Sequence, residues 1–298
     1  MKKLLIVGGL SSYDQNAEAS GEIHDFIKEV AGDQFEVLST HLDLITYTIA
    51  PGVFEAHDSR NNLDLHTVDM VFIRGPKISI TSSQASYLCR FCAWNGVKFL
   101  NDYSIYYSGT KVAQTIVFLE EGLPFLRTAY AANKALLIAY AEQKFGYPYV
   151  LKSSTASHGD SNYLVYSAEQ AQQIISGETG VDFLAQEFCP NDRDYRLLLL
   201  RDLSLTFERR GTAGSHLNNT SKGGEAKLAA GTVPDYIFRQ AHKVADRLGL
   251  TIAGVDVMPH LHTGEYYFLE INSQPQLRTG ALLEEKKTAL RRLFETGA

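Results

Sequence analysis

Two short apolar segments near the C-terminal end limit what this chain can fold into more than any other feature. Residues 254–258 and 267–273 are rich in β-branched and aromatic side chains and are separated by a turn, which predicts two antiparallel strands. Pairing about that turn places Asp256 opposite Glu270, and the alternation of side chains puts Asn272 on the face of Glu270. Like charges that face each other repel, and burying them costs free energy. This face therefore calls for a cation.

Carboxylate and amide oxygens are the ligands that Mg²⁺ prefers, and protein-bound Mg²⁺ commonly completes its shell with substrate phosphates. The alternative is a solvated hairpin face that carries ordinary surface acids. The apolar setting of the two strands favours the metal site.

The composition indicates a globular protein with more than one domain. The chain has 298 residues, of which 45% are hydrophobic and 21% charged. A net charge of −6, with no long Lys/Arg run, argues against nucleic-acid or anionic-membrane binding. The apolar runs are too short to span a bilayer, and the N-terminal one is too short for a signal peptide. We expect a cytoplasmic protein.

The three cysteines are expected to be buried structural thiols. Cys89 and Cys92 form a C-x-x-C in a stretch with helical character, but no second Cys or His pair lies at zinc-site spacing. Cysteine often packs as a small apolar residue, and we expect the same of Cys189.

The first hundred residues alternate strand-like and helix-like segments. This pattern predicts a small α/β domain with a largely parallel sheet. The expected strands are 4–7, 35–38, 68–74 and 97–100, and the expected helices are 19–30 and 83–94. The glycines after the first strand do not complete a G-x-G-x-x-G fingerprint and indicate an ordinary βα turn.

Arg74 ends an apolar strand in this domain. Ligands of open α/β sheets bind outside the carboxyl ends of strands, so Arg74 is a candidate for holding a substrate carboxylate. A surface arginine at a strand end is the alternative.

Asn101 and Asp102 mark a boundary and are expected to cap the next helix, which runs from Lys111 to Gly122. Further helices are expected near 135–144, 168–176 and 234–248, the second of them with a capping box at Ser167 and Gln170. Strands are expected at 147–152, 181–188 and 205–208.

The basic and polar residues of this second part occur in an order that predicts a nucleoside-triphosphate site without a Walker loop. Lys152 ends an apolar strand, so its ammonium is partly desolvated and needs an anion. The Ser- and Gly-containing loop 153–161 can offer backbone N–H groups to phosphates. Of Arg209 and Arg210, which end another strand, alternation directs only one inward.

These motifs resemble the ATP-grasp superfamily, and within it the RimK-like glutamate ligase branch. The resemblance covers nearly the whole chain and is strongest over residues 101–277. The resemblance assigns phosphate contacts to Lys111, Lys152 and the loop residues Ser157 and Gly159; adenine contacts to the hinge Gln186-Glu187-Phe188; the ribose-side "D-x-R" motif to Asp194 and Arg196; and the "N-x-x-[KR]-G-G" motif to residues starting at Asn219. The "A-G-V-D" and "E-x-N-x-x-P" motifs contain Asp256, Glu270 and Asn272 as magnesium ligands.

The resemblance implies an α/β (α+β) ATP-grasp fold. A pre-ATP-grasp α/β domain (1–100) would precede a central lobe (101–185) and a C-terminal lobe with the metal site (186–298), with ATP between the two lobes. Two Mg²⁺ ions are expected, with Mn²⁺ as an alternative. The loop after Lys152 has one glycine where relatives often have several, and Gln276 follows Pro275 where relatives carry a small residue.

The implied activity is an ATP-dependent carboxylate–amine ligase that works through an acyl phosphate. Arg210 would stabilise the transferring phosphoryl group, and Arg74 would hold a substrate carboxylate. A small-molecule kinase with the same ATP site and a non-catalytic nucleotide-binding scaffold are the alternatives. The substrates would be small molecules, amino acids or peptides; self-association and the roles of His158 and His216 stay open.

Overall fold

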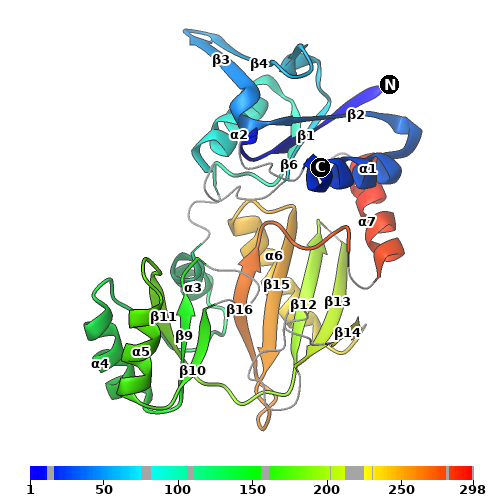
Figure 1. Cartoon of the computed structure of the whole chain (residues 1–298). Helices are drawn as coiled ribbons and strands as arrows, with labels where there is room; N and C mark the ends of the chain where they lie inside the picture. Colours follow the sequence, from blue (N-terminus) through cyan, green and yellow to red (C-terminus); the bar gives the residue numbers. More distant parts are fainter. Residues whose placement is uncertain are drawn as a thin grey trace.

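The structure is a computed structural model that describes residues 1–11, 17–74, 82–105, 110–155, 161–201, 203–211, 225–229, 231–279 and 282–296. These residues form an α/β domain above two further lobes, as Figure 1 shows. In this part of the chain, no helix combines the length and the apolar character that crossing a membrane would require.

The N-terminal domain contains the parallel sheet that its sequence predicts. The strand order is β2 (Phe35–His41), β1 (Lys2–Gly8), β6 (Met70–Ile73), β7 (Lys98–Leu100), and the helices are α1 (Ala17–Ala31) and α2 (Ser82–Asn95), with a short 3-10 turn at Gly32–Gln34. Alternate residues of β1 pack in different cores: Leu4 and Ile6 with α1, Leu5 and Val7 with α2. Both faces of the sheet are therefore covered, as parallel sheets require.

A second, antiparallel sheet in this domain was not predicted. Strands β3 (Ile45–Ala50), β4 (Val53–Asp58) and β5 (Leu63–Asp64) follow the 3-10 turn Leu42–Leu44 and precede the 3-10 turn Leu65–Thr67. The β3–β4 hairpin projects from the domain at the top of Figure 1. Its turn places Gly52 at φ +77°, a conformation that glycine adopts without strain.

The cysteines are buried and unbonded to one another, as expected. Cys89 and Cys92 lie on the inner face of α2 and Cys189 follows β11. Burial raises the pKa of Cys89 to about 12 and that of Cys189 to about 11, so both thiols stay protonated at neutral pH.

The central lobe has its own core. Its antiparallel sheet has the order β10 (Asn162–Val165), β9 (Tyr149–Ser153), β11 (Phe183–Glu187), β8 (Thr128–Tyr130), and its helices are α4 (Lys134–Phe145) and α5 (Ala168–Gly177). The capping box is confirmed: the Ser167 hydroxyl accepts a hydrogen bond from the Gln170 N–H at 3.2 Å. The core of this lobe runs from Ala129 to Ala185.

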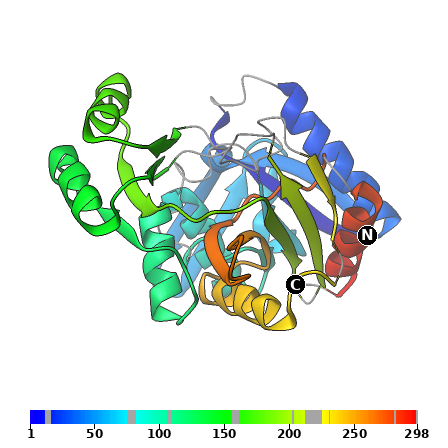
Figure 2. The same ribbon diagram turned by 90° about the horizontal axis from the view of Figure 1, so that it is seen from below.

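The C-terminal sheet joins the other parts of the molecule. Its antiparallel order is β14 (Glu225–Leu228), β13 (Leu203–Arg210), β12 (Asp194–Leu200), β15 (Ile252–Pro259), β16 (Tyr266–Asn272). Helices α3 (Lys111–Glu120) and α6 (Asp235–Arg247) pack in one core with this sheet, and α7 (Leu283–Thr296) packs in another core that includes α1. Figure 2 shows α7 beside α1, so the last helix ties the C-terminal lobe to the N-terminal domain.

Asn101 connects these parts, and the prediction that it caps the following helix is wrong. Thr110 caps α3 instead, since its hydroxyl accepts from the Ala113 N–H. The Asn101 side chain is buried, donates to the carbonyls of Ile252 (2.9 Å) and Ser273 (3.0 Å), and accepts from the Ile252 N–H at 2.7 Å. It thus fixes the end of β7 against β15 and the loop after β16.

Replacing Asn101 with Ala should lower the free energy of unfolding by about 3 kcal/mol, because three buried hydrogen bonds lose their partner. Asn62→Ala is the matched control: Asn62 also has a positive φ but is exposed, so only about 1 kcal/mol of backbone cost is expected. Urea unfolding of both variants measures the difference. Equal losses would show that the Asn101 bonds do not hold the parts together.

Candidate functional site

The strand pairing predicted from the sequence is confirmed. Asp256 of β15 pairs with Glu270 of β16, and Asn272 pairs with Gly254 on the same face. The register shifts directly after Asp256, so Leu269 stands as an extra residue in β16. The Asn272 amide donates to Glu270 Oε1 at 2.9 Å, which holds the two predicted metal ligands together.

Two arginines neutralise Asp256 in this structure. Arg196 binds it through two parallel bonds, Nε to Oδ1 at 2.7 Å and Nη2 to Oδ2 at 2.6 Å. Arg209 Nη2 lies 2.9 Å from the same Oδ2. Burial alone would raise the pKa of Asp256, but the two guanidinium groups outweigh it and hold the pKa well below its usual range. Asp256 is therefore a carboxylate at neutral pH.

Arg209 is the residue that sequence reasoning missed. It is buried and donates to Asp194 Oδ1 at 2.6 Å, so it bridges Asp194 and Asp256 across β12. Burial raises the pKa of Asp194, and Arg209 opposes that rise. The burial of Asp194 favours a role in positioning Arg209 over the contact with ribose that the motif suggested.

Arg210 lies on the opposite face of the sheet. It is 44% exposed, donates to Glu208 at 2.7 Å, and lies 3.5 Å from Asp192. This position does not favour the predicted role in phosphoryl transfer. The connection between Leu200 and Leu203 sets the register of β12 and β13 and places Arg209 opposite Asp194. Counting back from that turn is the signal that could have selected Arg209.

Two lysines approach the carboxylate face from other elements. Lys111 is the first residue of α3, and its Nζ lies 3.7 Å from Glu270 Oε2. Lys152 lies on β9, and its Nζ donates to Gln186 Oε1 at 2.6 Å. Burial lowers the pKa of Lys152 to about 8, although the charge of Glu270 partly opposes this shift. The lysines come from the start of α3 and from the central lobe, whereas Glu270 belongs to the C-terminal sheet.

The predicted hinge is held by side chains of the segment before and within β8. Gln186 is buried and donates to the Thr128 hydroxyl at 3.1 Å, and Glu187 accepts from Arg127 Nε at 2.6 Å. Phe188 is half-buried. A small apolar cluster lies where the lobes meet and consists of Leu126, Cys189, Met258, Tyr267 and Leu269.

Arg74 ends β6 and faces the loop after β16. Its Nη2 donates to the Pro275 carbonyl, while its Nη1 is buried with no hydrogen-bond partner among the described residues. Burial lowers its pKa to about 10, with Tyr103 partly opposing the shift. A buried guanidinium without a carboxylate partner is costly, so this group is suited to an anionic ligand.

Several predicted residues lie outside the described part of the chain. These are Ser157, Gly159 and Asn219, together with His158 and His216.

The residues of the carboxylate face fit a divalent cation. Asp256, Glu270 and Asn272 bring only oxygen ligands to one face of two neighbouring strands, which is the donor set that Mg²⁺ prefers. When bound there, Mg²⁺ would neutralise phosphate charge during phosphoryl transfer. Because Arg196 engages both oxygens of Asp256, a cation at this carboxylate must share it with Arg196 or displace that arginine.

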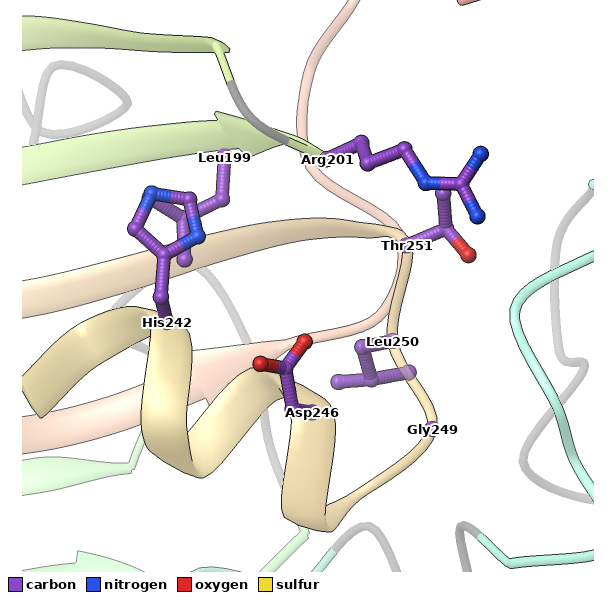
Figure 3. A pocket seen from close by; sticks show the side chains of 7 residues that line it. All are labelled: Leu199, Arg201, His242, Asp246, Gly249, Leu250 and Thr251. Atoms are coloured by element: carbon purple, nitrogen blue, oxygen red, sulfur yellow. The ribbon is translucent and has the colours of Figure 1, made fainter. Parts of the chain in front are cut away.

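The cavity in Figure 3 is separate from this site. It is lined by Leu199, Arg201, His242, Asp246, Gly249, Leu250 and Thr251. These residues lie at the far end of β12 from Asp194 and at the end of α6. We therefore assign the charged face, and not this cavity, as the candidate site.

Replacing Arg209 with Met should lower the free energy of unfolding by about 3–5 kcal/mol, because two buried carboxylates lose a shared partner. Arg210→Met is the matched control and should cost less than about 1 kcal/mol, since Arg210 is half-exposed. Thermal and urea unfolding of both variants would report the difference. Similar losses in the two variants would contradict the burial of Arg209 between the acids.

Comparisons with known proteins agree with this site. The RimK-like ATP-grasp domain model matches residues 110–288, which is more than half of the chain. A search of curated proteins finds no match.

Several solved structures share the fold. A RiPP-associated ATP-grasp ligase from Chryseobacterium gregarium is 14% identical, with a TM-score of 0.68 and coverage of 100% of this chain and 98% of that one. Macrocyclase MdnC from Microcystis aeruginosa MRC is 15% identical, with a TM-score of 0.70 and coverage of 99% and 100%. D-alanyl-alanine synthetase A from Vibrio cholerae O1 biovar eltor is 13% identical, with a TM-score of 0.67 and coverage of 99% and 98%. The expected ATP-grasp fold is confirmed, and the chain belongs to the RimK-like ATP-grasp family of ATP-dependent ligases.

Proposed function

We propose that this protein joins a carboxylate to an amine at the charged face of its C-terminal sheet, with ATP as the energy source. The observation that carries the proposal is the composition of that face. Four cations (Lys111, Lys152, Arg196 and Arg209) surround three carboxylates (Asp194, Asp256 and Glu270). The excess of positive charge suits the phosphates of ATP, and the acids with Asn272 suit the accompanying Mg²⁺.

The nucleotide is proposed to lie between the central and C-terminal lobes. The adenine packs between the hinge Gln186-Glu187-Phe188 and the apolar cluster of Leu126, Cys189, Met258, Tyr267 and Leu269, which lies at the same junction. Lys152 and Lys111 then meet the phosphates, since both point toward Glu270. Arg196 and Arg209 orient Asp256, and Arg196 also reaches 3.7 Å from Glu270.

The proposed reaction has two steps. An oxygen of the substrate carboxylate attacks the γ-phosphorus of ATP, a new O–P bond forms, and the bond to ADP breaks. An amine then attacks the acyl carbon, an amide forms, the amine loses a proton, and phosphate leaves. Both steps need positioning and charge neutralisation more than a protein nucleophile, and Lys152, Lys111 and Arg196 supply that charge.

Arg74 is proposed to hold the acid substrate across the site. Its Nη1 is buried and has no described partner, and its Nη2 binds the Pro275 carbonyl of the loop that follows Asn272. A carboxylate on Arg74 would therefore lie beside the strand end that carries the metal ligands. The C. gregarium ligase was solved with a leader and core peptide and MdnC with its precursor peptide, which supports a peptide as the acid or amine substrate.

ADP release over a panel of amino acids and peptides tests the proposal. A ligase gives ADP, free phosphate and an amide product whose mass equals that of both substrates less one water. A stable phosphorylated substrate without free phosphate would identify a kinase, and nucleotide binding without turnover across the panel would identify a scaffold.

Glu270→Gln should reduce ADP formation by at least about 100-fold, because the metal-binding face loses one of its two ligand carboxylates. The fold should be retained, since the amide keeps the shape of the side chain. Glu265→Gln, an exposed residue just before β16, is the matched control and should keep full activity. Coupled ADP assays and circular dichroism would measure both, and unchanged turnover in Glu270→Gln would overturn the assignment of the metal face.

ADP affinity should fall as the pH rises through about 8, because Lys152 then loses its proton and its charge. Lys152→Arg should remove this dependence, since a guanidinium keeps its charge. Calorimetric titration at several pH values measures the affinity. Between the folded pKa of about 8 and the model value of 10.5, the unfolded chain binds more protons at Lys152, so this residue alone makes stability rise with pH. Identical pH profiles for the variant and the wild type would contradict the role of Lys152.

A further inference from the structure

The hairpin of the N-terminal domain has an open edge. Strand β3 (Ile45–Ala50) pairs with β4 on one side, and among the described residues no strand pairs with its other side. In an antiparallel pair, every second residue directs its N–H and C=O away from the partner strand. The free side of β3 therefore presents a row of backbone donors and acceptors.

This edge lacks the features that normally protect edge strands. The sequence of β3 is Ile-Thr-Tyr-Thr-Ile-Ala, which has a high strand propensity and contains neither a charged residue nor a proline. Exposed edges usually carry lysine, proline or a bulge, because an unprotected edge pairs with other chains. Since β3 has none of these within its length, it is suited to receive another strand.

Apolar side chains near the tip extend this surface. Ile49 is 73% exposed and Val53, across the hairpin turn, is 39% exposed. Tyr47 of the same strand is only half-buried, and it lies on the face that packs toward α2. An uncharged edge with exposed aliphatic side chains at its end can bury apolar surface when it pairs.

We infer that β3 pairs with β3 of a second copy of this chain, antiparallel and about a two-fold axis. Self-pairing brings only Ile, Thr, Tyr and Ala side chains opposite one another, so no like charges meet at the new strand pair. A two-fold interface uses the same patch on both subunits, which a charge-free edge allows. The hairpin projects away from the two ATP-grasp lobes (Figure 1), so pairing at β3 leaves the charged face accessible.

Light scattering after size-exclusion chromatography of the full chain tests this inference. Wild type should have twice the 33.1 kDa mass of one chain at micromolar concentration. Ile49→Lys and Thr48→Lys should each raise the dissociation constant of the dimer by roughly tenfold or more, because each places like charges near the axis. Both side chains are exposed in the monomer, so thermal unfolding should remain close to wild type.

His57→Lys is the matched control. His57 is exposed on β4, whose backbone already pairs with both β3 and β5, so this variant should remain a dimer. Amide hydrogen exchange gives a second readout: β3 should lose protection when the wild-type protein is diluted below its dissociation constant. A monomeric wild type, or a dimer that both lysine variants on β3 leave intact, would overturn the inference.

Discussion

The buried carboxylate of Asp256 is the constraint on which the rest of the site depends. A carboxylate in this position is stable only with counter-charge, and Arg196 and Arg209 supply it from neighbouring strands. Asp194 in turn holds Arg209 at 2.6 Å. The result is a charged network whose members all come from the middle strands of one sheet. A metal that binds at Asp256 enters a site that the protein has already neutralised.

The fold keeps this network in place while it leaves the lysines on separate elements. Asn101 and α7 fasten the C-terminal sheet to the N-terminal domain, and α3 packs on β16 through the rings of Phe118 and Phe268 at 5.9 Å. The central lobe has a core of its own and carries Lys152. A ligand between Lys152 and Glu270 therefore lies between two separately packed bodies, which is the arrangement expected of a site that holds a nucleotide.

Much of the sheet that carries the site could be predicted from the sequence. The pairing of Asp256 with Glu270 follows from strand alternation and a single turn, and both are local properties. The stripe of Ile237, Ala241 and Val244 on α6 and the cap at Ser167 were also predictable, because helix periodicity and capping depend on neighbouring residues.

The parts that sequence reasoning missed depend on long-range contacts. Arg209 and Arg210 are identical in type, and only the register with β12 decides which one is buried. Asn101 has the residue type of a helix cap, but its partners Ile252 and Ser273 lie more than 150 positions away along the chain. Their contacts with Asn101 form only in the folded protein.

The position of a bound metal tests the account most directly. Crystals grown with Mn²⁺ and a non-hydrolysable ATP analogue would show Mn²⁺ by its anomalous scattering. The account predicts an anomalous peak within coordinating distance of the oxygens of Glu270 and Asn272 and of the nucleotide phosphates, with Lys152 on the phosphate side. Nucleotide bound elsewhere, for example in the cavity beside Arg201 and His242, or a nucleotide at the charged face with no metal near Glu270, would contradict it.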